Sequence, residues 1–482
     1  MKLGIIGDDF TGSSDIANNL KKSGMQVSMY AGIPTLLPSE IKKELTDAAV
    51  IALKTRTIPI EEAISESLKA LAWLKDCGCE QFIFKYCSTF DSTKKGNIGP
   101  VADAIMKELN TDFILVLHGG FTMGDVALTF AESNFKLGFW SVPEPTLTGD
   151  VQLNNFVSLN MSMSIAKKVR NTSKNPVSWY YGFADNKEFK QKITLTLQTL
   201  QSLKTLSRSR IGLIGGLAMT FYNMEVSTTK LKTKLGVDIF NHDIHELTNR
   251  MSNQSSKNVD EEIQKILRLA KPDSVSKEQL KLTAQAVLSL RDIKNENNYS
   301  ALAVSDWPAL QEIANMHPGA AFSILEEVDN IPVASEGDIL GAISQIIAKS
   351  FTGKVGYLLD MTEPDFDRDS LLMWHGGGGP LYLANKAGVK WVNHPMIGRG
   401  TDQGPIYGTI SDLVFQVGSV SVFRISNNAK SIFYLNAKVE DINPNGFTGC
   451  RGWLTDFRMN NKQIALNDLL SVIMTVSYTH LR

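Results

Sequence analysis

Apolar and polar positions along residues 1–116 alternate between strand-like and helix-like segments. LGIIGDD, VSMYAG, AVIALKT and QFIFKYCST predict short strands. Apolar residues at helical spacing predict helices in SSDIANNLKKSG, which ends at Gly24, in IEEAISESLKALAWLKDCG and in GPVADAIMKELN. This alternation is typical of a parallel sheet with helices on both faces, so we expect a Rossmann-like α/β domain over residues 1–115.

The alternation continues through the centre of the chain. FILVLHGG and RIGLIGGLA each predict a strand that runs into a glycine turn, and NNFVSLNMSMSIAKKV predicts a helix between them. Residues 227–300 are rich in charged and helix-forming residues, which predicts helices on the outside of the domain. We therefore expect further Rossmann-like α/β structure over residues 116–345.

From about residue 350 the pattern changes to short apolar segments separated by Gly, Pro and Asn. KVGYLLDM, LMWHGGGGP, SDLVFQVGSVSVFRIS and SIFYLNAKV predict short strands. They indicate a β-rich C-terminal domain over residues 346–475. The fold class expected for the whole chain is α/β, with parallel sheets at the N-terminus and centre and β structure at the end.

Composition narrows the functional classes. The chain has 482 residues, 43% of them hydrophobic, and a net charge of −1. A net charge this close to zero gives no electrostatic attraction to nucleic acid or to an anionic membrane. No apolar run reaches the roughly 18 residues that span a bilayer. The N-terminus lacks a signal-peptide pattern, and the four cysteines do not form a disulfide framework. We expect a cytoplasmic protein whose ligand is a small molecule.

Polar clusters follow three of the predicted N-terminal strands. They are Asp8-Asp9, Lys54-Thr55-Arg56 and Lys85 to Ser88, with Asp91 close behind. The carboxyl ends of parallel strands line the ligand crevice of such a sheet. Lys and Arg there suit a carboxylate or phosphate, and Asp and Ser suit hydroxyls. The alternative is ordinary loop polarity and helix capping.

A second group of acidic and histidine residues, which could bind a metal or transfer a proton, lies between positions 300 and 410. Glu336 and Asp338 precede a predicted helix, Asp360 ends an apolar segment taken as a strand, and His375 and His394 follow. Carboxylates and imidazole suit Mn²⁺ or Mg²⁺, which would polarise a sugar carbonyl while a carboxylate carries the proton. The alternatives are an acidic first helical turn, a cap at Asp360 and structural histidines.

Residues 1 to about 112 resemble the start of the four-carbon acid sugar kinase family, which phosphorylates acids such as 3-oxo-tetronate. The matching segments are GDDFTGSSDIA, KTRTIP and FKYCSTFDSTKKGNIGPVADA. The resemblance implies a sugar-acid-binding half domain with ligand contacts at Asp8, Asp9, Arg56, Lys85 and Asp91. The rest of that family's pattern is missing and no G-x-x-x-x-G-K-[ST] replaces it, so we do not expect ATP as a cofactor.

From about residue 113 the chain resembles the L-fucose isomerase-like family. The segments are LHGGFTMGDVA, VPEPTLTGDVQLNNFVSLN, SDWPALQ, IPVASEGDILGA, YLLDMTEPD and LLMWHGGGGP. The resemblance implies an Mn²⁺ site at Glu336 and Asp360, with His375 as a further ligand and with Gly376 where the family has Cys. It also implies a homo-oligomer. We expect Trp307, Gln311 and His394 to contact substrate.

The two resemblances meet inside TDFILV, which indicates a natural fusion or a false join of two sequences. DLLSVIMT, taken as a strand, runs into VSYTHLR, which looks like an adapter-derived tail over residues 476–482. The histidine segment that ends isomerase-like proteins is missing. Three hypotheses remain: an aldose–ketose isomerase with Glu336 and Asp360 as catalytic residues, inactive if truncated; a sugar-acid-binding kinase fragment; or a non-catalytic sugar-binding protein.

Overall fold

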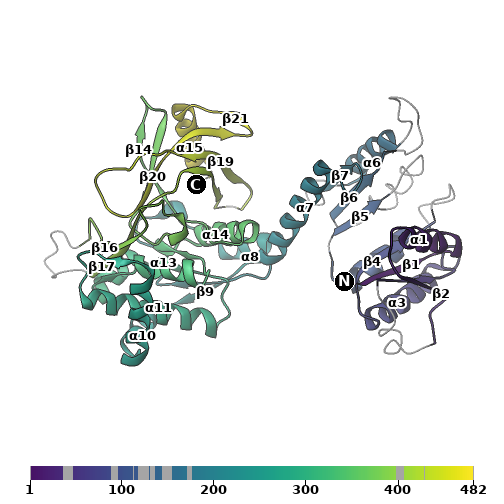
Figure 1. Ribbon diagram of the computed structural model, residues 1–482, viewed down its shortest axis with the longest axis horizontal. Helices are drawn as coiled ribbons and strands as arrows, with labels where there is room; N and C mark the ends of the chain where they lie inside the picture. Colours follow the sequence, from purple (N-terminus) through teal and green to yellow (C-terminus); the bar gives the residue numbers. More distant parts are fainter. Residues whose placement is uncertain are drawn as a thin grey trace. The chain divides into compact units, whose positions relative to one another are not determined.

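The chain has a mixed α/β fold with parallel sheets and a β-rich C-terminal region, as predicted (Figure 1). It divides into two compact units, Met1–Thr196 and Leu197–Arg482. The computed structural model describes residues 2–35, 47–87, 96–111, 113–117, 130, 136–143, 155–170, 176–397, 407–427 and 429–480. The domain boundaries expected at residues 115, 345 and 475 stay predictions.

The first sheet of unit 1 is parallel, with strand order β2-β3-β1-β4. Its elements are β1 (Lys2–Gly7), α1 (Phe10–Lys22), β2 (Val27–Ala31), β3 (Ala48–Ala52), α3 (Ile60–Asp76), β4 (Cys79–Lys85) and α4 (Ile98–Glu108). Alternate residues of β1 face opposite layers: Ile5 packs against α1, whereas Ile6 packs with α3 and α4. The predicted helix end is confirmed, because Gly24 has a φ of 91° just beyond α1.

The second sheet of unit 1 has three parallel strands in the order β5-β6-β7. Its elements are β5 (Phe113–Leu117), β6 (Lys136–Ser141), α6 (Asn155–Val169), β7 (Val177–Tyr181) and α7 (Lys187–Leu206). Val116, Phe139 and Leu159 form its buried centre. This sheet supplies the predicted strand at FILVL and the predicted helix after it.

Unit 2 is built on a parallel sheet with strand order β13-β11-β8-β9. Its strands are β8 (Arg210–Ile214), β9 (Asp238–His242), β11 (Ala301–Val304) and β13 (Val333–Ala334). The helices of this region are α8 (Thr228–Leu235), α9 (Ile244–Ser252), α10 (Ser256–Leu269), α11 (Lys277–Glu296), α13 (Gly319–Val328) and α14 (Ile339–Thr352). One face of the sheet packs on α9, α11 and α13, and the other packs on α8 and α14.

The helices expected over residues 227–300 are present, but one of them is not on the outside. Ala284, Val287 and Leu290 of α11 are fully buried, and α11 packs against α9, α10 and α13. The prediction of an outer helix was wrong for α11 because its charged residues lie near its ends, while its middle is apolar.

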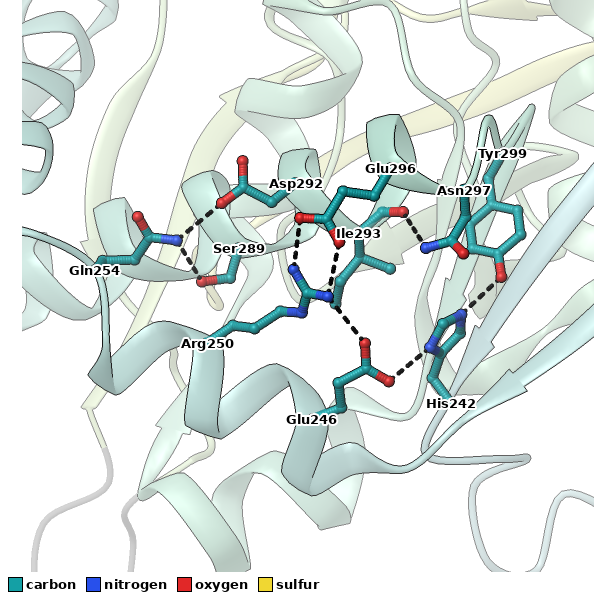
Figure 2. Close-up of polar contacts among 10 residues, drawn as sticks. All are labelled: His242, Glu246, Arg250, Gln254, Ser289, Asp292, Ile293, Glu296, Asn297 and Tyr299. Carbon is teal, nitrogen blue, oxygen red and sulfur yellow. Dashed lines mark hydrogen bonds and ion pairs between the residues drawn. The ribbon is translucent and has the colours of Figure 1, made fainter.

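Polar contacts join α9 to α11 at the surface of unit 2 (Figure 2). Two guanidinium nitrogens of Arg250 donate to Glu296 at 2.9 and 2.8 Å, and one reaches Glu246 at 3.3 Å. Glu246 also contacts His242, whose other ring nitrogen lies 2.7 Å from the hydroxyl of Tyr299. Each of these side chains has a hydrogen-bond or ion-pair partner, so we interpret the network as a structural link between α9 and α11.

The C-terminal region supplies eight strands of a ten-stranded sheet, whose core includes Leu371, Leu413 and Phe457. The other two, β10 (Lys271–Pro272) and β12 (Met316–His317), come from earlier in the chain. The C-terminal strands include β14 (Asp360–Asp365), β15 (Ser370–His375), β16 (Lys390–Asn393), β17 (Tyr407–Val414), β18 (Gly418–Ile425), β19 (Ile432–Val439) and β20 (Cys450–Met459). The predicted β-rich domain is therefore present.

Two local predictions in the C-terminal region were wrong. VGYLL is not a strand, so Asp360 begins β14 rather than ending an earlier strand. DLLSVIMT belongs to the helix α15 (Leu466–His480), in which Leu466 and Leu469 reach the sheet core at helical spacing. Within the described residues, no helix is both long enough and apolar enough to cross a bilayer.

Candidate functional site

The N-terminal polar residues meet at one edge of the first sheet. Asp8 directly follows β1, Thr55 and Arg56 follow β3, and Lys85 ends β4. Backbone hydrogen bonds connect the three strand ends: the N–H of Asp8 donates to the carbonyl of Lys85 at 3.1 Å, and that of Thr55 donates to the carbonyl of Asp8 at 3.1 Å. The parallel sheet therefore brings these residues together as the sequence predicted.

Asp8 and Asp9 have different roles. Asp9 caps α1, since its carboxylate accepts the N–H of Gly12 at 2.7 Å, and it lies 3.8 Å from Arg56. This is the capping role that we had held as the alternative. Asp8 is only 4% exposed and caps no helix. One of its oxygens accepts the N–H of Cys87 at 3.0 Å.

Burial raises the pKa of Asp8 to about 6. The hydrogen bond from Cys87 lowers it, the charge of Asp9 raises it, and Lys85 and Arg56 lower it. The ammonium of Lys85 donates to the carbonyl of Tyr86 at 2.8 Å. Asp91, the fifth predicted contact, lies outside the described residues.

A pocket of about 210 Å³ opens beside these strand ends. Its lining includes Asp8, Thr55, Arg56 and the start of α4. The second carboxylate oxygen of Asp8 and the hydroxyl of Thr55 are buried there without a hydrogen-bond partner. Buried polar atoms nearly always have partners in folded proteins, so these two oxygens indicate space for a ligand or water.

Two residues of this site were not among the predicted ligand contacts. Thr55 belongs to the predicted strand-end cluster Lys54-Thr55-Arg56 but had no assigned role, and Asn97 lies inside the quoted segment GNIGPVADA. Asn97 donates from its side-chain amide to the carbonyls of Thr55 at 2.7 Å and Ile58 at 2.8 Å. No local pattern predicts those contacts, because their partners are about 40 residues away.

Unit 2 holds a second polar cluster around an unusual turn. Glu336 has a φ of 61°, in the left-handed region that few non-glycine residues adopt. Its N–H donates to the carboxylate of Asp306 at 2.6 Å, and its carbonyl accepts the N–H of Ala218 at 2.9 Å. Such strained residues persist when their surroundings hold them, and they concentrate at functional sites.

Burial raises the pKa of Glu336 to about 7. His375 lowers it, while the charges of Asp306, Asp360 and Asp338 raise it. The structure therefore brings the predicted residues Glu336, Asp360 and His375 within electrostatic reach of one another. Asp306 was missed, although it stands beside Trp307 just after β11, where the strand-end rule applies.

Asp338 and Glu336 play separate parts. Asp338 caps α14 by accepting the N–H of Gly341 at 2.9 Å, and its two oxygens accept from Arg424 at 2.7 and 3.0 Å. The helix-start alternative thus holds for Asp338. Glu336 lies outside the helix, in the preceding turn.

The three histidines of the cluster are His375, His394 and His317, and their surroundings differ. Nδ1 of His375 lies 3.1 Å from the carbonyl of Gly377, to which it must donate, and Nε2 lies 3.3 Å from the hydroxyl of Ser335. Burial and His375 lower the pKa of His394 to about 4. Burial also lowers the pKa of His317, which lies 3.5 Å from Asp306.

The predicted substrate contacts in SDWPALQ differ in environment. Trp307 is 41% exposed and meets the ring of Phe221 edge to face. The side-chain nitrogen of Gln311 is buried without a partner. Among the described residues, no group of three or more His, Cys, Asp and Glu side chains is arranged to hold a metal ion. The donor types suit Mn²⁺, but their present arrangement does not form such a site.

Comparisons with known proteins concern mainly the N-terminal part. The family described as "Sugar-binding N-terminal domain" matches residues 3–125. A 3-oxo-tetronate kinase of Escherichia coli is 54% identical over 114 residues, which cover 23% of this chain and 28% of that protein. The corresponding kinase of Haemophilus influenzae is 48% identical over 145 residues, which cover 28% of this chain and 34% of its own length.

Similarity to solved structures is weak. A Haemophilus influenzae protein of the DUF1537 family aligns over 64% of this chain and 88% of its own, at 20% identity and a TM-score of 0.25. A TM-score this low does not show that the two proteins share a fold. The chain spans about a third or less of the length of the two kinases. What the comparisons establish is that about a quarter of the chain, at its N-terminus, is similar to a sugar-binding domain.

Proposed function

We propose that unit 1 binds a four-carbon sugar acid of the 3-oxo-tetronate type at the edge of β1, β3 and β4. The observation that carries this proposal is the pair of buried, unpartnered oxygens on Asp8 and Thr55. Asp8 and Thr55 line a pocket in the segment that is similar to a sugar-binding domain and to 3-oxo-tetronate kinases.

The chemistry of the pocket suits such a ligand. A four-carbon sugar acid carries one carboxylate and several hydroxyls on a short chain. Arg56 supplies a cation for the carboxylate, and Asp8 supplies an acceptor for a hydroxyl. A pocket of about 210 Å³ is of the size that a small molecule needs.

Phosphoryl transfer is not part of the proposal. The chain has no G-x-x-x-x-G-K-[ST] segment, and its similarity covers 28% of the Escherichia coli kinase and 34% of the Haemophilus influenzae kinase. We expect binding of the sugar acid without ATP consumption. A coupled ADP-release assay with D-erythronate and D-threonate checks this, and ADP formed in proportion to either acid would contradict it.

Calorimetric titration of the full chain tests the binding itself. D-erythronate and D-threonate are titrated beside erythritol and threitol, which have the hydroxyls but lack the carboxylate. We expect saturable heat with at least one acid and none with either alditol at the same concentration. Absence of heat with both acids, or equal binding of the alditols, would remove the proposal.

We propose aldose–ketose isomerisation at the Glu336 cluster as a second candidate function. The observation that favours it is that Glu336 is held in a left-handed turn by Asp306 and Ala218, while burial raises its pKa to about 7. A carboxylate with a pKa near the working pH can both accept and return a proton. It could therefore carry the proton from C2 to C1 of a sugar through an enediol, while the proton of the C2 hydroxyl passes to the C1 oxygen.

The remaining residues of the cluster would support this transfer by placing charge around it. His375 lowers the pKa of Glu336 and so favours its proton-accepting form. A divalent cation would supply polarisation of the carbonyl when bound, and Glu336, Asp360 and His375 remain its predicted ligands. The transfer of the carbon-bound proton is assigned to Glu336, whose carboxyl has a pKa raised to about 7.

Two measurements test the second candidate. A panel of pentoses, deoxyhexoses and four-carbon sugar acids is assayed for aldose–ketose interconversion with wild type and Glu336→Gln, and calorimetry follows Mn²⁺ binding by both. We expect turnover and Mn²⁺ binding by the wild type only. If neither protein binds Mn²⁺ or converts any sugar, the isomerase proposal is lost while the sugar-acid proposal stands.

A further inference from the structure

Asn97 is the N-cap residue, directly before the first residue of α4, but its side chain does not cap that helix. Asn commonly accepts an N–H of the first turn at this position, but here the side chain makes no such bond. Its amide instead donates away from the helix, to the carbonyls of Thr55 at 2.7 Å, Arg56 at 3.4 Å and Ile58 at 2.8 Å. One amide thereby ties the loop after β3 to the start of α4.

Because the side chain of Asn97 does not cap α4, no side-chain cap from the described residues occupies the start of this helix. The helix has 11 residues, and its first N–H groups, those of Ile98 and Gly99, have no intrahelical acceptor. The third helical residue, Pro100, has no N–H. Gly96, Asn97 and Ile98 line the pocket, so the positive end of the helix dipole opens on the same space as Arg56.

Independent evidence for a ligand comes from the opposite wall. Asp8 is 4% exposed and Thr55 is 2% exposed, and both residues line this pocket. Each has a buried side-chain oxygen without a hydrogen-bond partner. Those oxygens suit the hydroxyls of a ligand, since the carboxylate of Asp8 can accept and the hydroxyl of Thr55 can donate or accept. The pocket thus has one end that suits an anion and one that suits hydroxyls.

We infer that Asn97 is a positioning residue that orients the sugar acid, with the ligand carboxylate at the start of α4 and a ligand hydroxyl at Asp8 and Thr55. This inference rests on the proposed sugar-acid binding and adds an orientation to it. Asn97 acts in two ways: it holds Thr55 and Arg56 in the pocket, and it leaves the first N–H groups of α4 for the carboxylate.

The substitution Asn97→Asp separates these effects from simple loss of structure. Aspartate has the same size and is at least as good a helix cap, so the fold is expected to remain. It cannot donate to the three carbonyls, and it places its own negative charge where the ligand carboxylate should lie. Asn18→Asp on the exposed face of α1 is the matched control, because it makes the same charge change away from the pocket.

The test uses calorimetry on the full chain with two probes, D-erythronate and its neutral amide, D-erythronamide. We expect Asn97→Asp to weaken the acid by about 30-fold or more and the amide much less, while Asn18→Asp changes neither. Thr55→Val, which keeps the shape of the side chain, should weaken both probes by about tenfold.

The outcomes separate this inference from the proposed function. If wild type binds D-erythronate but Asn97→Asp binds it unchanged, or weakens acid and amide equally, the orientation is wrong and the sugar-acid site stands. If Thr55→Val leaves both probes unchanged, the hydroxyl end is wrong. If wild type binds neither D-erythronate nor D-threonate, the proposed function itself has failed.

Discussion

Two adjacent aspartates illustrate how position decides chemistry at the scale of single residues. The carboxylate of Asp9 caps the first turn of α1, whereas Asp8 has one carboxylate oxygen without a hydrogen-bond partner. From sequence both were equal candidates, because the type of residue was the same. The difference arises from the direction in which the chain turns after β1, which residue type alone does not specify.

The raised pKa of Asp8 predicts pH-dependent binding. A ligand hydroxyl donates more strongly to the carboxylate than to the carboxylic acid. Burial raises the pKa of Asp8 to about 6, against the charges of Lys85 and Arg56. Affinity for D-erythronate should therefore rise from pH 5 to pH 7 and level off above it. Titrations across this range with Asp8→Asn as control check the assignment, and an unchanged slope in that variant would refute it.

Buried Glu326 predicts a different pH effect, on stability. Burial raises its pKa well above the usual range, opposed by the N–H of Val333 and the amide of Gln345. As pH rises above the unfolded-state pKa, the unfolded chain releases this proton while the folded chain retains it, so stability falls.

Replacement by glutamine should remove this loss. The difference in unfolding free energy between Glu326→Gln and wild type should grow in favour of the variant by up to about 1.4 kcal/mol per pH unit between pH 5 and the folded-state pKa. Urea unfolding of both proteins at several pH values measures it. A difference that stays constant with pH would mean that Glu326 ionises normally.

At the scale of elements, the strands and helices of unit 1 were predictable because apolar periodicity is a local signal. The wrong predictions concerned segments whose apolar pattern is compatible with more than one backbone structure. VGYLL is apolar enough for a strand but contributes Tyr357 and Leu359 to the sheet core from irregular backbone, and DLLSVIMT fits the sheet core as a helix. Tertiary packing made these choices.

The candidate sites were predictable to a similar extent. Asp8, Arg56 and Glu336 follow from strand ends and motif resemblance. Asp306 was missed although it follows β11, where the strand-end rule applies. Arg424 and Asn97 do not follow from any such rule, because each acts through partners about 40 or more residues away in sequence. Long-range hydrogen bonds have no local signature.

The turn at residues 335–338 gives an element-scale prediction. Gly337 has a φ of 70°, and a Cβ there would lie 2.1 Å from the carbonyl oxygen of Gly216. Gly337→Ala should therefore cost about 3 kcal/mol or more. Gly353→Ala is the control, since that residue has a φ of 77° in open space and should cost about 1 kcal/mol. Chemical denaturation measures both, and equal losses would show that the turn is not tightly held.

At the scale of the whole molecule, the two units carry two separate chemical proposals. The N-terminal similarity to a sugar-binding domain supports ligand binding, and the strained Glu336 turn favours proton transfer elsewhere in the chain. Neither proposal depends on the other. A protein with only the first would bind a sugar acid without converting it, which corresponds to the sugar-acid-binding kinase fragment, the second hypothesis drawn from the sequence.

A homo-oligomer is the assembly that we propose together with the second candidate function. Light scattering coupled to size exclusion should then give a mass of at least twice 53.1 kDa. A single 53.1 kDa species at all concentrations would contradict that prediction and weaken the second candidate function.

The central claim is that a four-carbon sugar acid binds at the edge of β1, β3 and β4. A crystal structure of the full chain soaked with D-erythronate tests it most directly. We predict ligand density in this pocket, with a hydroxyl on Asp8 and Thr55 and the carboxylate at the first N–H groups of α4. An empty pocket at saturating D-erythronate, or ligand bound only elsewhere, would contradict the account.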